Sequence, residues 1–206
     1  MRLYLSSEGL GREPEALAAL IGGGGSAAVV LNAGDDAGDD SRPYRLSGEC
    51  AALASIGITG EELDLRSCSS SVDTAAALRR YDAVWVAGGN TFVLRAAMWR
   101  CGFDDAIRAL LADDRIVYAG YSAGSVAVTP SLRGIELVDD PSPVPPDQLR
   151  WDGIGLVPYS IAPHYRSASP DSPAIDNVVA YFRRHHMPFR ALTDGDVIVI
   201  NEAEAP

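Results

Sequence analysis

The stretch from Arg115 to Val128 constrains the fold most, because a short apolar run meets a Gly-x-Ser-x-Gly pattern and continues into small residues. The run predicts a buried strand, the pattern at 120–124 a tight turn, and the small residues a helix. Glycines on both sides of Ser122 let the chain reverse sharply and let neighbouring backbone come close. The serine hydroxyl can then stand exposed at the tip of the turn, as in a nucleophile elbow.

The same turn offers hydrogen-bond donors. A helix begins with unpaired backbone N–H groups, and that of Ala123 points to where an acyl oxyanion would form beside Ser122. Because five-residue patterns recur by chance, the alternative is a strand-to-helix turn that carries no chemistry.

Strands and helices alternate along the rest of the chain. Continuous apolar runs at 27–31 and 83–87 predict strands that helices cover on both faces. Shorter strands are predicted at 2–5, 58–65, 154–157, 159–162, 189–193 and 197–200. Helices are predicted at 14–21, 42–56, 73–81, 92–100, 103–111 and 174–184. This succession predicts an α/β fold with a mostly parallel sheet, whose ligands bind at the carboxyl ends of the strands.

Length and charge narrow the class of protein. With 206 residues and 47% hydrophobic content, the chain can close one sizeable core, so we expect a single domain over 1–206. The net charge of -11 argues against nucleic acid or an anionic membrane surface as a partner, since both would be repelled. The N-terminal apolar stretch is too short for a signal peptide, and no stretch is long enough for a membrane helix.

The sequence predicts neither a disulfide framework nor a bound metal. Cys50, Cys68 and Cys101 are odd in number and widely spaced, so a reducing cytoplasm is the simplest setting. The acid-rich stretch at 32–36 could attract a divalent cation, but no regular ligand spacing surrounds it and a solvated loop is the preferred interpretation.

A second glycine turn follows the strand at 83–87. Gly88 and Gly89 precede a helix, and glycines at the end of a strand let backbone N–H groups face a ligand. The alternative is a plain turn, because the Gly-x-Gly-x-x-Gly fingerprint of phosphate binding is missing. Both glycine turns are expected at the same edge of the sheet.

A serine nucleophile needs a base, and the chain has three histidines. His185 and His186 stand near a helix end among arginines, where solvent and the helix dipole explain them. His164 follows a proline at the end of a short strand and can reach the ligand edge, so it is the candidate base. A buried structural histidine is the alternative.

The histidine in turn needs a carboxylate, for which Asp194 is the candidate and Asp196 the substitute. Asp194 and Gly195 stand between two predicted strands. Asp-Gly in that position is also typical of a hairpin turn, so Asp194 could be present only for its turn geometry.

Three motifs, at 87–92, 120–125 and 163–165, resemble in order and spacing those of the dipeptidase E (aspartyl dipeptidase) family of serine peptidases. The resemblance runs from the first strand to the end of the chain. It implies a three-layer, flavodoxin-like sheet with helices on both faces, related to class I glutamine amidotransferases. It also implies a Ser-His-Glu triad whose acid precedes a glycine near the C-terminus.

Carried over to this chain, the resemblance implies that Ser122 is the nucleophile, His164 the base and Asp194 the acid. The N–H groups of Gly89 and Ala123 would form the oxyanion hole. Aspartate here replaces the family's glutamate, a shorter side chain that needs a closer backbone.

Substrate contacts are expected from Asn90, directly after Gly88 and Gly89, from Tyr121, within the turn at 120–124, and from Arg166, the cation nearest to His164 in the sequence. The aspartyl enzymes keep an arginine after the histidine motif to bind an acidic substrate side chain. The segment at 172–179 does not match it, so peptidase chemistry is better supported than specificity for N-terminal aspartate.

The leading hypothesis is a cytoplasmic serine peptidase that hydrolyses short peptides through an acyl-enzyme, without metal or cofactor. Its expected partner is a small peptide substrate, and a homodimer is one alternative for its oligomeric state. A second hypothesis is an α/β-hydrolase-type esterase, whose acid would precede His164 and be Asp139, Asp140 or Asp152. The chain is short for that fold. A third hypothesis is a non-catalytic small-molecule binding domain.

Overall fold

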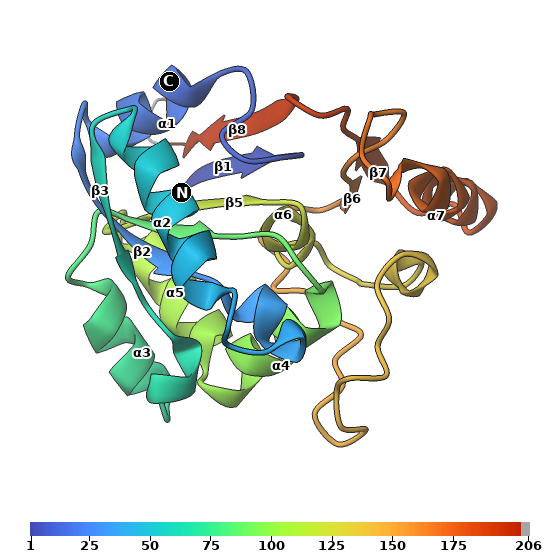
Figure 1. Ribbon diagram of the computed structural model, residues 1–206, viewed down its shortest axis with the longest axis horizontal. Coiled ribbons are helices and arrows are strands. Elements are labelled where there is room, and N and C mark those ends of the chain that lie inside the picture. The colour runs from blue at the N-terminus through green and yellow to red at the C-terminus, as the bar shows by residue number, and fades with distance from the viewer. Residues whose placement is uncertain (203–206) are drawn as a thin grey trace.

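A six-stranded sheet with helices on both faces forms the centre of the computed structural model, which describes residues 1–202 (Figure 1). Its strands are β1 (Arg2–Ser6), β2 (Gly25–Val30), β3 (Ile58–Glu62), β4 (Ala83–Val86), β5 (Val117–Tyr121) and β8 (Val197–Asn201). They lie in the order β3-β2-β4-β5-β1-β8, and all neighbours are parallel except β8, which runs antiparallel to β1. The predicted mostly parallel α/β fold is confirmed.

The α-helices are α1 (Pro14–Ile21), α2 (Arg42–Ala54), α3 (Ser71–Leu78), α4 (Thr91–Arg100), α5 (Phe103–Ala112), α6 (Ala123–Val126) and α7 (Ser172–Arg184). Short 3-10 helices within residues 1–202 are η1 (Asn32–Ala37), η2 (Leu65–Ser67) and η3 (Ile135–Leu137). Proline stands in the first turn of α1, α2 and α7, where its missing N–H costs no hydrogen bond. The acid-rich stretch expected to be a loop is η1.

The two faces of the sheet are buried in separate clusters, which explains the continuous apolar strands. Val84 and Val86 of β4 pack with α4 and α5 on one face. Ala83 and Trp85 of the same strand pack with α1 and α2 on the other. Each residue of β4 is therefore buried, whichever way its side chain points.

A small second sheet lies beside the main one, where parallel strands β6 (Ser160–Ala162) and β7 (Phe189–Ala191) pack against α7 (Figure 1). The prediction of a strand at 154–157 is wrong. This segment is irregular, and its backbone N–H groups donate hydrogen bonds to the residues directly after α6. Glycines explain the difference. A Cβ on Gly153 would lie 1.9 Å from the Thr129 carbonyl oxygen, and Gly155 has a φ of +73°.

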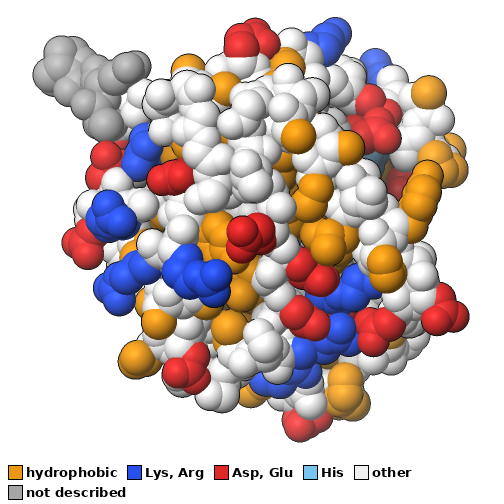
Figure 2. All heavy atoms as spheres, turned by 60° about the vertical axis from the view of Figure 1, so that its left-hand side comes forward, with side chains coloured by type: hydrophobic (Ala, Val, Ile, Leu, Met, Phe, Trp, Pro, Cys, Tyr) orange, Lys and Arg blue, Asp and Glu red, His pale blue; other side chains and the backbone are white. Residues whose placement is uncertain are grey.

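Opposite charges are interspersed on the surface. On the face in Figure 2, acidic and basic side chains lie beside each other. One such network joins Arg42 to Asp35 and Glu62 at 2.6 Å each, and Arg66 to Asp64 at 2.7 Å. Within residues 1–202, none of the helices has the length and apolarity needed to cross a membrane.

Candidate active site

Ser122 occupies a strained turn between β5 and α6, with φ 48° and ψ -116°. Its N–H group lies 3.3 Å from the Ser6 carbonyl oxygen and 3.2 Å from that of Ser7, at the end of β1. The flanking glycines are required by the close approach of β4. A Cβ on Gly124 would lie 2.2 Å from the Val86 carbonyl oxygen, so the helix could not start here with a larger residue.

Ser122, His164 and Asp194 lie in one hydrogen-bonded line. The Nε2 atom of His164 is 3.1 Å from the Ser122 hydroxyl, and its Nδ1 atom is 2.7 Å from Asp194 Oδ1. His164 is buried, so little water competes for either contact. The separations suit proton transfer from serine to imidazole and stabilisation of the resulting imidazolium.

Ser7, at the end of β1, connects the residues of this line. Its buried hydroxyl accepts a hydrogen bond from the His164 N–H at 2.8 Å and lies 3.2 Å from Asp194 Oδ1. The sequence analysis missed this residue. The sequence does contain a pair of serines directly after the first strand. They are expected at the same edge of the sheet as the polar turns that follow the other strands, which could have indicated a role for Ser7.

Asp196 shapes the turn that carries Asp194. Its Oδ2 atom accepts hydrogen bonds from the Thr193 N–H at 2.8 Å and hydroxyl at 2.7 Å, and Arg12 contacts its other oxygen. Hydrogen bonds from Thr193 lower the pKa of Asp196. The hairpin interpretation of this segment is wrong, because β7 and β8 belong to different sheets. Asp194, not Asp196, contacts the histidine.

The second glycine turn faces the same site. Gly89 has a φ of +137°, and a Cβ there would lie 2.5 Å from the Ala33 carbonyl oxygen, which accepts the Asn90 N–H at 2.7 Å. Within residues 1–202, no acceptor contacts the N–H of Gly89 or of Ala123. Both residues line the cavity beside Ser122, so two free donors are available near its hydroxyl.

This cavity has a volume of about 200 Å³. Four branched apolar residues contribute to its lining: Val126, Ile135, Val138 and Ile175. Such a space is smaller than the roughly 300–1,000 Å³ of drug-sized ligand pockets. It therefore suits one amino-acid residue better than a long peptide.

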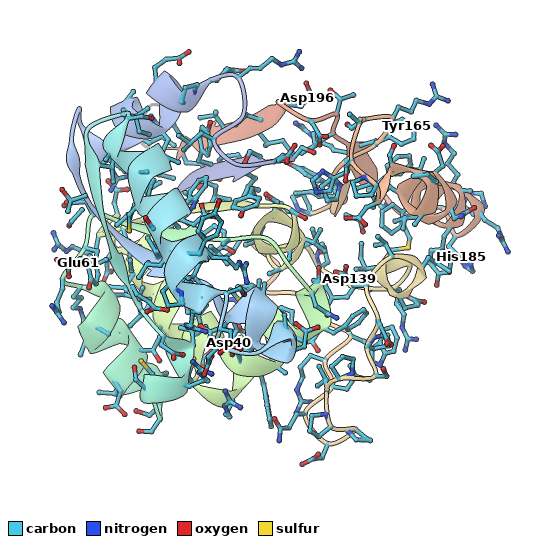
Figure 3. All side chains as sticks on the ribbon, in the orientation of Figure 1. Asp40, Glu61, Asp139, Tyr165, His185 and Asp196 are labelled. Atoms are coloured by element: carbon cyan, nitrogen blue, oxygen red, sulfur yellow. The ribbon has the colours of Figure 1, made fainter. Side chains whose placement is uncertain are left out.

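Asp139 lines the cavity and does not contact His164. Its Oδ2 atom accepts a hydrogen bond from the Thr91 N–H at 2.8 Å, at the start of α4 (Figure 3). Burial raises the pKa of Asp139, and the neighbouring charge of Asp171 acts in the same direction. Asp140 is exposed and bonds to Ser142. Since His164 pairs with Asp194, the triad order expected of an α/β-hydrolase esterase is not formed.

The residues expected to contact substrate lie outside the cavity lining. Asn90 caps α4 by accepting the Phe92 N–H at 2.9 Å. Tyr121 points to the opposite face of the sheet, where it donates to Glu49 at 2.7 Å. Arg166 is exposed, with its guanidinium 5.0 Å from the centre of the Tyr165 ring, which Figure 3 labels.

The remaining histidines are remote, and one further carboxylate is near. His185 lies at the end of α7, with its ring 4.2 Å from that of Tyr181 (Figure 3). A carboxylate oxygen of Glu8 lies within 4.8 Å of His164 and Asp194, a grouping that could in principle hold a cation. His164 and Asp194 already bond to each other, and Glu8 is an exposed acid beside them.

Residues 40–206 match the model of peptidase family S51. An uncharacterized peptidase from Listeria innocua is 32% identical over 155 residues, which cover 74% of this chain and 71% of that protein. Peptidase E of Streptomyces coelicolor is 38% identical over 121 residues, or 59% of this chain and 45% of that protein. A crystal structure of a protein from Listeria monocytogenes that bears the peptidase E name superposes with a TM-score of 0.80 and 24% identity, over 98% of this chain and 95% of the other.

The fold and the family match together define a serine peptidase of the α/β class. The chain belongs to peptidase family S51, and the expected membership in the dipeptidase E family is confirmed.

Proposed function

We propose that this peptidase hydrolyses dipeptides and other short peptides through a covalent acyl-enzyme, with Ser122, His164 and Asp194 as its catalytic triad. The observation that carries the proposal is the line from the Ser122 hydroxyl through the His164 ring to Asp194, at 3.1 and 2.7 Å. No other histidine stands in such a contact within residues 1–202.

The mechanism follows from the contacts. The Ser122 hydroxyl oxygen attacks the scissile carbonyl carbon while His164 Nε2 takes its proton. Asp194 holds the Nδ1–H and stabilises the imidazolium that forms, and the N–H groups of Gly89 and Ala123 bind the oxyanion. The imidazolium then gives its proton to the leaving amine. Water, activated by the same histidine, releases the acyl group and restores Ser122.

The size of the cavity supports a short substrate. An opening of about 200 Å³ beside Ser122 accepts the residue that contributes the acyl group, and the rest of the peptide lies toward solvent. We also propose that the protein works in a reducing compartment such as the cytoplasm, since Cys50, Cys68 and Cys101 are free thiols. A homodimer stays a prediction.

A dipeptide screen tests the proposal. Wild-type protein should release free amino acids from at least one dipeptide, and Ser122→Ala should reduce the rate to background while its thermal unfolding stays cooperative. Asp194→Glu, which restores the acid of the family triad, is a matched variant that should keep more activity than Asp194→Asn. Equal activity of wild-type protein and Ser122→Ala would refute the role of Ser122.

A further inference from the structure

Both charged groups that line the cavity together with His164 are acidic. Asp139 contributes one carboxylate from inside, and Asp171 contributes another from the exposed end of the segment before α7. No arginine lines the cavity, and within residues 1–202 neither carboxylate forms an ion pair with one. The cavity wall therefore carries two negative charges that the protein leaves without a cation.

We propose that this cavity selects peptides whose N-terminal residue has a basic side chain, with Asp171 as the residue that determines the preference. The inference rests on the proposed peptidase function. A dipeptide brings an α-ammonium group next to its scissile carbonyl, and that cation compensates one carboxylate. A lysine or arginine side chain supplies the second cation.

The positions of the two carboxylates support the pairing of one with the α-ammonium group and of the other with the substrate side chain. Asp139 is fixed by the Thr91 N–H at 2.8 Å, and its raised pKa reflects burial and the nearby charge of Asp171. A bound cation relieves both effects, since it replaces lost hydration and offsets the repulsion. Asp171 is exposed and lines the same cavity as Asp139, so a longer side chain can reach it.

The apolar wall favours a long aliphatic stem over a short polar side chain. Val126, Ile135 and Ile175 are buried and line the same cavity as His164 and the two acids. Lysine and arginine bury their methylene groups along such a surface while the charged end stays near water. An acidic side chain in the same place would face two like charges and no cation.

Binding of dipeptides to Ser122→Ala tests the inference independently of turnover. Isothermal titration should show that Lys-Leu binds about three- to tenfold more tightly than norleucyl-leucine, which has a similar stem without the charge. The factor is modest because an ion pair at an exposed rim contributes little. Hydrolysis of both peptides by wild-type protein is measured separately, so a failure of the proposed chemistry leaves the binding preference visible.

Two variants in the Ser122→Ala background assign the preference. Asp171→Asn should abolish the difference between Lys-Leu and norleucyl-leucine. Asp176→Asn removes the same charge from an exposed position on α7 that does not line the cavity, and it should leave the difference intact. Equal binding of the two peptides, a preference that survives Asp171→Asn, or no measurable binding of either peptide would overturn the inference.

Discussion

Ser7 contacts two residues of the proposed triad without lining the cavity itself. Its buried hydroxyl contacts both the backbone of His164 and the carboxylate of Asp194. Because carbonyl oxygens at the same strand end also accept the Ser122 N–H, the end of β1 contacts all three residues of the proposed triad. We therefore treat Ser7 as a positioning residue.

Ser7→Ala should lower kcat about tenfold and leave KM nearly unchanged. The variant leaves a buried N–H of His164 unpaired, which costs about 1–3 kcal/mol, while the cavity lining stays the same. Steady-state kinetics on the best dipeptide separate the two constants. Ser142→Ala, at an exposed loop, is the control. A normal kcat in Ser7→Ala would show that the triad does not need this hydroxyl.

Asp139 should make stability depend on pH in a direction set by its raised pKa. The folded protein keeps the proton of Asp139 up to a higher pH than the unfolded chain does. As the pH rises, ionisation of Asp139 therefore destabilises the folded state. The melting temperature of Asp139→Asn relative to wild type should therefore increase from acidic to neutral pH. Thermal unfolding at both ends of that range measures it.

Asp140→Asn is the control with the opposite sign. Hydrogen bonds from Ser142 lower the pKa of Asp140, so its ionised form favours the folded state and that contribution grows as the pH rises. The relative melting temperature of this variant should fall over the same range. If both variants followed the same trend, the raised pKa of Asp139 would be contradicted.

The sequence predicted Ser122, His164 and Asp194 as nucleophile, base and acid from their local settings, and the structure brings the three side chains into contact. The sequence did not exclude that Asp194 is present only to form a hairpin turn with Gly195. The strands that pair with β7 and β8 are distant in the chain, so the sequence did not show that β7 and β8 belong to different sheets. Tyr121 was expected near substrate and points to the other face of the sheet. The direction of a side chain at a strand end depends on the register with neighbouring strands, which one sequence does not reveal.

At the scale of elements, the backbone of β4 lies very close to Gly124 at the start of α6, in the turn that carries Ser122. Gly124→Ala should destabilise the protein by about 1–3 kcal/mol, because its Cβ would lie 2.2 Å from a backbone oxygen that cannot move without distorting β4. Denaturant unfolding measures the change. Peptidase activity should fall with it, since Ser122 loses its position.

Gly48→Ala is the matched control for that substitution. Gly48 lies inside α2, where an added Cβ meets nothing within 4 Å, so alanine should stabilise the helix by about 0.5–1 kcal/mol. A stable, active Gly124→Ala protein would contradict the proposed reason for glycine at the elbow.

Elements with strong local patterns were predicted well, and those defined by distant partners were not. The helix predicted at 14–21 is α1, and the buried runs became β2 and β4. The strands predicted at 159–162 and 189–193 are β6 and β7, but their pairing in a separate small sheet was not predicted, because α7 separates them in the chain. The apolar run at 154–157 formed no strand. Its backbone bonds to the residues directly after α6, and Gly153 and Gly155 allow the close approach and the positive φ of this segment.

At the scale of the whole molecule, an excess of acidic groups and an acid-lined cavity disfavour acidic substrates. Asp-Leu should not be preferred over Ala-Leu in kcat/KM, because no arginine lines the cavity to pair with the substrate carboxylate. A preference for Asp-Leu of about tenfold, equivalent to about 1.4 kcal/mol, would contradict this expectation. Arg166→Ala would then show whether Arg166 reaches the substrate.

The central claim is that His164 and Asp194 activate Ser122. Mapping the adduct of a fluorophosphonate probe by mass spectrometry tests it most directly, because the probe reacts with an activated serine whatever the peptide substrate. We predict a single adduct on Ser122, its loss in Ser122→Ala, and labelling slowed by orders of magnitude in Asp194→Asn, since triads lose about 10⁴ in rate without the acid. Labelling of another residue, or an unchanged rate in Asp194→Asn, would contradict the account.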